Sequence, residues 1–175
     1  MVRYYTIPRQ WAPLSIRNEQ RKAEIERELE DLFYKWEGTP YMSGNQCIKL
    51  GVDCVRFVTA FLDSLHKIKT SITTLPSDAS FHNKRAAMKT MLTIKKLYAP
   101  CKTLPEDSAI EPGDVIIIGP PGGGPAHAMI AGTEPNTIWH CTTDIGVVKT
   151  GWALAAGQQQ IYRVYRIRNR AKLWS

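Results

Sequence analysis

Helical periodicity fills the first part of this 175-residue chain, and short β-rich segments fill the rest. Apolar residues recur at spacings of three and four in 17–36 and 54–65, which predicts amphipathic helices. A second basic stretch, 83–98, is also predicted to be helical and to end before Pro100. The predicted strands are rich in Ile, Val, Thr and aromatic residues: 114–118, 126–131, 137–142, 146–149 and 160–167. Helices first and strands afterwards favour an α+β fold with an antiparallel sheet of about five strands.

The length and the 43% hydrophobic content suit one domain spanning 1–175. Within it we expect an N-terminal helical extension at about 1–38 and a basic helical insertion at about 67–105. The apolar run 115–118 is too short to cross a bilayer, so we expect no membrane span. The first eleven residues lack the apolar core of a signal peptide, which predicts synthesis in the cytoplasm without one.

The formal net charge of +7 is unevenly distributed along the chain. Acidic and basic residues balance in 1–38, whereas 79–105 holds no acid and carries several lysines and an arginine. Such a surface suits anionic partners, either nucleic acid or an anionic cell-wall polymer, although a solvated face is the favoured interpretation. Because the stretch lacks interleaved aromatics and any nucleic-acid-binding motif, we do not expect nucleic acid as a partner.

Cys54 has the sequence context of an activated nucleophile. Gly51 breaks the preceding structure, Asp53 is a good N-cap, and Cys54 then becomes the first residue of the helix. The positive end of a helix dipole lowers a thiol pKa and favours the thiolate. The alternative is that Cys54 is simply a small buried apolar residue, the commonest fate of a free cysteine. The other cysteines, Cys47, Cys101 and Cys141, fit neither a zinc pattern nor a disulfide framework.

His127 and His140 lie on neighbouring predicted strands. If the turn between them contains an even number of residues, as 133–136 would, Gly132 pairs with Thr137. His140 is then the diagonal neighbour of His127 on the same face of the sheet, so the two rings can meet. A one-residue bulge would place them on opposite faces.

A cysteine at a helix N-terminus, a histidine on a neighbouring strand and a third polar group form the arrangement of papain-like hydrolysis. Cys54 would attack a carbonyl carbon, and His127 would take the proton and return it to the leaving amine. His140 would orient the ring of His127. The same three donors also suit zinc, which residue order alone does not exclude.

The order of several short motifs resembles that of the NlpC-type cysteine peptidases, from about residue 38 to 151. The matching motifs are Thr39-Pro40-Tyr41 with Gly44, Asp53-Cys54 with Phe57-Val58, Pro112-Gly113-Asp114-Val115, His127 to Gly132, and Trp139-His140. This resemblance implies a papain-like α+β fold and cleavage of amide bonds in peptidoglycan stem peptides, typically between D-glutamate and diaminopimelate. It implies no cofactor and no metal.

By the same resemblance, Cys54, His127 and His140 would be the catalytic residues. Tyr41 would help form the oxyanion and substrate subsite, and Asp53 would receive a free amine of the substrate. The chain departs from the family at Val55 and Arg56, where a serine and a glycine are usual. Arg56 would then meet an acidic group of the substrate, or be a solvated helix charge.

Family members without a signal peptide include phage tail components and effectors passed through a secretion apparatus. The resemblance therefore predicts action at the bacterial cell wall, with other virion tail proteins or a secretion apparatus as partners. A competing hypothesis from a different class is a catalytically idle structural or binding module of a phage tail or assembly.

Overall fold

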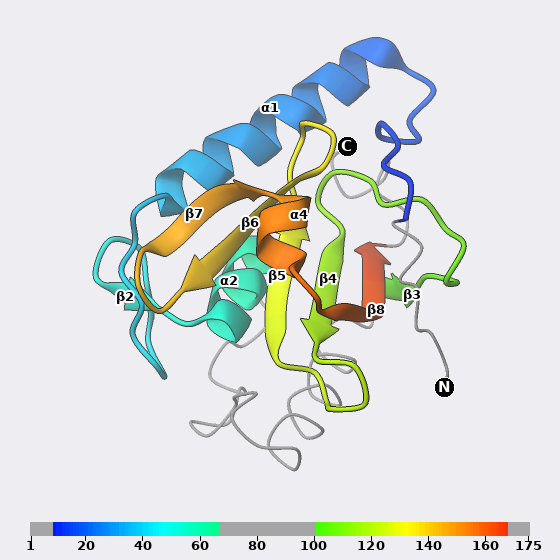
Figure 1. Cartoon of the computed structure of the whole chain (residues 1–175). Helices are drawn as coiled ribbons and strands as arrows, with labels where there is room; N and C mark the ends of the chain where they lie inside the picture. The colour runs from blue at the N-terminus through cyan, green and yellow to red at the C-terminus, as the bar shows by residue number, and fades with distance from the viewer. Residues whose placement is uncertain (1–8, 67–100, 168–175) are drawn as a thin grey trace.

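The computed structural model describes residues 9–66 and 101–167, and its core is an antiparallel sheet with helices on both faces (Figure 1). The sheet order is β3-β8-β4-β5-β6-β7. Its strands are β3 (Cys101–Thr103), β4 (Val115–Gly119), β5 (His127–Ala131), β6 (Thr137–Thr142), β7 (Gly146–Gly151) and β8 (Gln160–Ile167). A small hairpin pairs β1 (Gln46–Cys47) with β2 (Gly51–Val52). The prediction of an α+β fold is confirmed, with six strands in the main sheet rather than about five.

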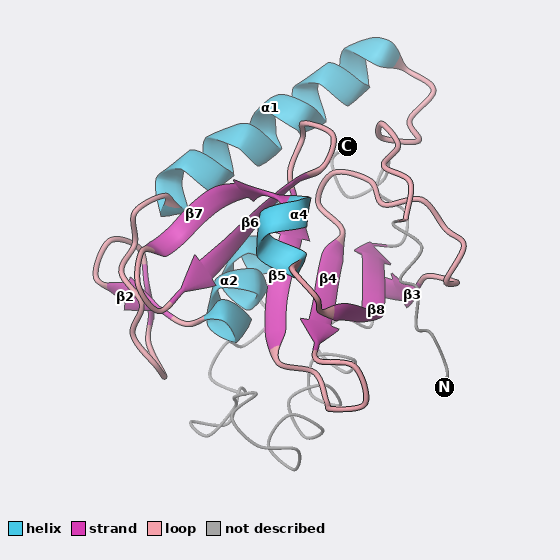
Figure 2. Ribbon diagram, in the orientation of Figure 1, coloured by secondary structure: helices cyan, strands magenta, loops and turns pink. Residues whose placement is uncertain are grey.

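The helices of the described residues are α1 (Glu19–Trp36), α2 (Cys54–His66) and the short α4 (Trp152–Ala156). Figure 2 shows α2 behind the sheet and α4 in front of it. The predicted helix at 17–36 is confirmed within two residues, whereas α4 was not predicted. The predicted helix at 83–98 lies outside the described residues. No described helix combines the length and the apolar character that crossing a membrane demands.

Alternation along each strand supplies an apolar layer to both faces of the sheet, because successive side chains point to opposite sides. On β6, Trp139 and Cys141 face the core that contains α2, whereas Ile138 belongs to the second cluster, beside α4. The strands β4 and β5 divide their residues between the same two clusters. Both faces are therefore covered, and the sheet is the centre of the domain.

α2 is more deeply buried than its sequence pattern predicts. Its apolar residues are buried, and so are the polar side chains of Arg56 and Thr59. The hydroxyl of Thr59 donates to the carbonyl of Val55 at 2.9 Å, so burial leaves it satisfied. α2 packs against β5 and β6 on one side and against α1 on another.

α1 is fixed to this core by aromatic stacking. Asn18 caps its N-terminus by accepting from the backbone amide of Arg21 at 3.0 Å. The ring of Phe33 lies between two others, with its centroid 5.0 Å from Trp139 and 4.4 Å from Phe61. One α1 side chain thus joins the sheet and α2 in a single packed layer.

A buried ion cluster holds β8 to the segment before β4. Arg166 donates from Nε and Nη2 to the two carboxylate oxygens of Asp114, at 3.0 and 2.7 Å, and from Nη1 to Glu111 at 2.5 Å. Asp114 is fully buried and also accepts from the backbone amide of Glu111. The Pro-Gly-Asp-Val motif is therefore a structural junction, because its carboxylate anchors the strand that neighbours β4.

Candidate active site

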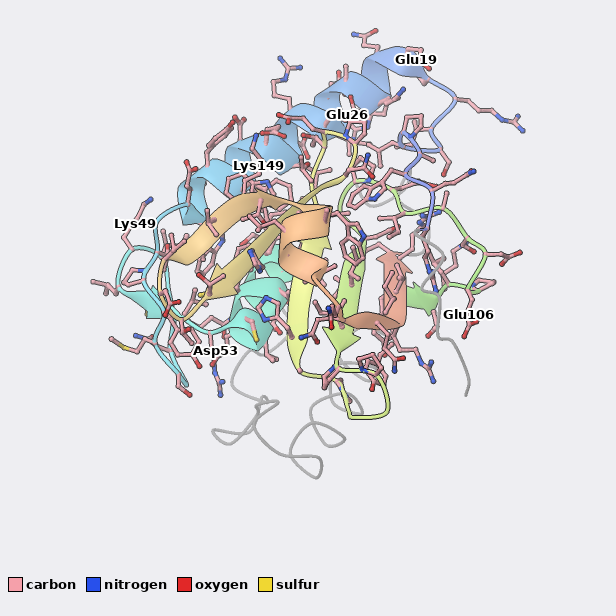
Figure 3. All side chains as sticks on the ribbon, in the orientation of Figure 1. Glu19, Glu26, Lys49, Asp53, Glu106 and Lys149 are labelled. Atoms are coloured by element: carbon pink, nitrogen blue, oxygen red, sulfur yellow. The ribbon has the colours of Figure 1, made fainter. Side chains whose placement is uncertain are left out.

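The N-terminus of α2 is built as its sequence predicts. Asp53 accepts from the backbone amide of Arg56 at 2.9 Å, which is the geometry of an N-cap, and Cys54 is the first helical residue. Figure 3 shows Asp53 just ahead of α2. The thiol therefore lies at the start of a helix on the face of the sheet that α2 covers.

The two strand histidines meet, as the predicted register requires. β5 and β6 pair Met129 with His140 and Ala131 with Ile138, and the amide of Gly132 donates to Thr137 at 2.8 Å. This is the register predicted from an even-numbered turn. Nε2 of His127 lies 2.9 Å from Nδ1 of His140, so the rings share a hydrogen bond.

The histidines and the cysteine come from opposite faces of the sheet. His140 lies opposite Met129, which belongs to the cluster beside α4, whereas Cys54 belongs to α2 on the other face. In the described chain, the β5–β6 ladder runs only from Met129–His140 to Ala131–Ile138, so the strand ends at His127 and Ala128 are not paired with β6. The Cys54 sulfur lies where β5 and β6 separate, and it accepts a hydrogen bond from the backbone amide of Ala128 there.

One cavity of about 410 Å³ gathers these groups. Its lining comes from the loop before β1, the start of α2, the split between β5 and β6, and the segment around α4. The lining residues are Tyr41, Ser43, Asp53, Cys54, Val55, Ile118, Ala126, His127, His140, Cys141, Thr142, Thr143, Ala155 and Gln159. The structure thus brings the three predicted catalytic side chains to a single hollow.

Two walls of the cavity are joined at Gly146. Its φ of +86° is unfavourable for other residues, and a Cβ there would lie 2.2 Å from the carbonyl oxygen of Thr39. The amide of Val147 donates to that oxygen at 2.8 Å. This contact holds the loop that carries Tyr41 against the turn that carries Thr142 and Thr143.

The protonation states differ from the predicted thiolate. Burial raises the pKa of the Cys54 thiol to about 11, and this outweighs the opposing effect of hydrogen bonds from backbone amides, that of Ala128 foremost. Burial lowers the pKa of His127 to about 3, with a further contribution from His140, and lowers the pKa of His140 to about 4. The predicted net lowering of the thiol pKa is wrong for this resting state, because burial outweighs the helix N-terminus, and thiol and both rings are neutral.

Asp53 and Arg56, predicted to bind substrate, bind each other. Nη1 of Arg56 donates to Asp53 Oδ2 at 2.6 Å, and the amide of Gly44 donates to the same oxygen at 2.9 Å. Both residues are buried, with exposed fractions of 6% and 5%. The interpretation of Arg56 as a solvated charge is therefore wrong. The carboxylate at the cavity is already neutralised by a cation of the same helix.

Tyr41 lines the cavity, as the predicted subsite requires, and forms an isolated bridge with Val52. Within the described residues, no group of three or more His, Cys, Asp or Glu side chains is placed to hold a metal ion. In the proposed zinc set, Nε2 of His127 and Nδ1 of His140 are directed at each other.

Sequence reasoning missed three polar residues of this region. The hydroxyl of Thr150 lies 3.2 Å from Nε2 of His140, beyond the predicted end of its strand. Buried Cys141 donates to the carbonyl of Val52 at 3.2 Å. Gln159 lines the cavity, and its Oε1 atom is buried without a hydrogen-bond partner among the described residues. The β6–β7 register would have indicated Thr150, because it pairs His140 with Val148, two residues away.

No protein-family model matches this sequence, and no curated protein matches it. Among solved structures, the chain is similar to the NlpC/p60 domain of the peptidoglycan hydrolase SagA, at 17% identity and a TM-score of 0.48, over 81% of this chain and 98% of that one. It is also similar to a lipoprotein-like protein of the NLP/P60 family from Staphylococcus aureus, at 18% identity and a TM-score of 0.48. That match covers 84% of this chain and 42% of the other.

Proposed function

We propose that this chain is an NlpC-type cysteine endopeptidase that hydrolyses amide bonds in peptidoglycan stem peptides, of the γ-D-Glu–diaminopimelate type. The observation that carries the proposal is the cavity whose lining includes Cys54 and the hydrogen-bonded pair of His127 and His140. The order of motifs along the chain supports the substrate class, and the cavity contains the cysteine and the histidines that the reaction requires.

The reaction proceeds in two steps. The Cys54 sulfur attacks the peptide carbonyl carbon as His127 takes the thiol proton, and collapse of the tetrahedral intermediate forms a thioester while His127 protonates the departing amine. Water then attacks the thioester, its proton passing through His127 to the sulfur, which releases a carboxylate and restores the thiol. Because thiol and imidazole are neutral at rest, His127 acts as a general base during attack rather than as half of a preformed ion pair.

His127 has one ring nitrogen available for this proton. Its Nε2 atom is hydrogen-bonded to Nδ1 of His140, which leaves Nδ1 of His127 to accept the thiol proton. Backbone amides at the start of α2, those of Cys54 and Val55, hydrogen-bond to the sulfur and stabilise negative charge on it. Tyr41, which also lines the cavity, would complete the substrate subsite.

The free-amine role of Asp53 requires that an incoming ammonium compete with Arg56. Since Arg56 already pairs with the carboxylate at 2.6 Å, we propose that this subsite accepts an uncharged part of the peptide. Stem peptides whose N-terminus is still amide-linked fit this requirement better than released peptides with a free amine.

The test is release of peptide fragments from purified diaminopimelate-containing sacculi, followed by mass analysis. Cys54→Ala should abolish release with folding retained. The matched control is Cys47→Ala, because Cys47 lies on β1, is exposed and stands outside the cavity. Equal loss in both variants would contradict the assignment of Cys54, and fragments cut at a different bond would contradict the substrate.

The alternative, a catalytically idle module, is favoured by one observation, the raised pKa of Cys54. Iodoacetamide labelling separates the two functions. If His127 assists the thiol, Cys54 is alkylated selectively near neutral pH, and a His127→Gln variant loses that reactivity. Labelling of Cys54 slower than that of exposed Cys47 in both proteins would favour the idle module.

Delivery to the wall by a phage tail or a secretion apparatus stays a prediction of the resemblance alone.

A further inference from the structure

The hydrogen-bond chain at the site does not end at His140. Its Nε2 atom lies 3.2 Å from Oγ1 of Thr150, and its Nδ1 atom lies 2.9 Å from Nε2 of His127. β6 and β7 pair Ile138 with Thr150 and His140 with Val148, so Thr150 lies on the same face of the sheet as both histidines. His127, His140 and Thr150 therefore form one continuous relay along three neighbouring strands.

Two proton arrangements satisfy this relay. Both rings are neutral near pH 7, since burial holds their pKa values at about 3 and 4, and a neutral ring carries one N–H and one lone pair. In the first arrangement, His127 donates from Nε2 to His140, and His140 donates from Nε2 to Thr150. In the second, every donor and acceptor is reversed, and Thr150 donates to His140.

Only the first arrangement leaves His127 able to act as a base. It places a lone pair on Nδ1 of His127, the nitrogen left for the thiol, whereas the second places a proton there. The first arrangement needs an acceptor at the far end of the relay, because otherwise the buried N–H of His140 is left unpaired. His140 is only 6% exposed, so water is a poor substitute for that acceptor.

We propose that Thr150 is a positioning residue of this site, whose hydroxyl accepts from His140 and thereby sets the tautomers of both histidines. The inference rests on the proposed function for its kinetic consequence but not for the hydrogen bonds themselves. It adds to the site a residue that acts through His140 and is not among the residues that line the cavity.

The direct test is the tautomeric state of the two rings, measured by long-range ¹H–¹⁵N NMR on protein labelled with ¹⁵N-histidine. The variants are Thr150→Val, which keeps the shape and removes the hydroxyl, and Thr150→Ser, which keeps the hydroxyl. Wild type and Thr150→Ser should carry the proton of each ring on Nε2, and Thr150→Val should shift His140 toward the Nδ1–H form. An Nδ1–H form of His140 in the wild type, or unchanged tautomers in Thr150→Val, would overturn the proposal.

Kinetics on soluble muropeptides prepared from sacculi supply the second test. Thr150→Val should lower kcat about tenfold with KM unchanged, since one neutral hydrogen bond that fixes the base is lost, and Thr150→Ser should recover to within about twofold of wild type. Thr103→Val is the matched control, because Thr103 is exposed on β3 at the other edge of the sheet. A loss shared by Thr150→Ser and Thr150→Val would contradict the positioning role.

The two tests fail separately. If the wild type releases no fragments from sacculi while its rings show the expected tautomers, the proposed function is wrong and the assignment of Thr150 stands. If fragments are released and the tautomers do not respond to Thr150→Val, the function stands and Thr150 is only a packing residue.

Discussion

Two neutral histidines, the buried His140 and the partly buried His127, make the stability of this domain depend on pH, and the effect can be isolated by replacing both. In the unfolded chain a histidine titrates near pH 6.5, whereas in the fold burial lowers the pKa of His127 to about 3 and that of His140 to about 4. At pH 5 each unfolded ring is protonated and each folded ring is not. Because each ring must lose its proton on folding, the free energy of unfolding at pH 5 is lower than at pH 8 by about 2 kcal/mol for each ring, or about 4 kcal/mol together.

The sign follows from the depressed pKa values. The contribution of the rings is fully present above pH 6.5 and is lost as the pH falls to about 4 for His140 and to about 3 for His127, because the unfolded state binds more protons there. Asp63 acts in the opposite direction, since burial raises the pKa of its carboxyl to about 6. A comparison with a His127→Gln/His140→Gln double variant removes the contribution of Asp63, which is the same in both proteins.

The assay is urea unfolding followed by circular dichroism at pH 8 and at pH 5. Between these values the wild type should lose about 4 kcal/mol more of its unfolding free energy than the double variant, a large share of ordinary domain stability. Equal losses in the two proteins would refute the reasoning, because they would show that the rings are already protonated in the fold or remain in contact with water.

Two further predictions concern single side chains. His140→Asn should retain more muropeptide cleavage than His140→Ala, because an amide oxygen can accept from Nε2 of His127, and indistinguishable rates would remove the orienting role. Phe33→Ala should lower the free energy of unfolding by about 3–5 kcal/mol, since this fully buried ring stacks on both Trp139 and Phe61, and a loss below about 1 kcal/mol in urea unfolding would contradict that packing.

The pairing of the two histidines could be predicted from the sequence because it depends on local rules. The turn at 133–136 has an even number of residues, and strand side chains alternate, so the faces of His127 and His140 follow from counting. The N-cap at Asp53 is equally local, since it requires only a carboxylate three residues before the amide it accepts from.

Features that depend on long-range burial were not predictable in the same way. Arg56 looks like a surface charge on a helical wheel, and only the packing of α2 between the sheet and α1 shows that it is buried. The prediction of a lowered pKa for Cys54 was wrong for the same reason, because the helix dipole is a local effect and desolvation is set by the whole fold. The three-residue β3 carries no alternation that sequence could reveal.

The split between β5 and β6 has a consequence for when the site comes into existence. The hydrogen-bonded histidine pair needs only β5 and β6, whereas the Cys54 sulfur is carried by α2, which packs on the opposite face of the sheet. A form of the chain in which the sheet is folded and α2 is undocked would hold the histidine pair and no nucleophile. The proposed hydrolysis would therefore require docked α2, whereas the ring tautomers would report on the sheet alone.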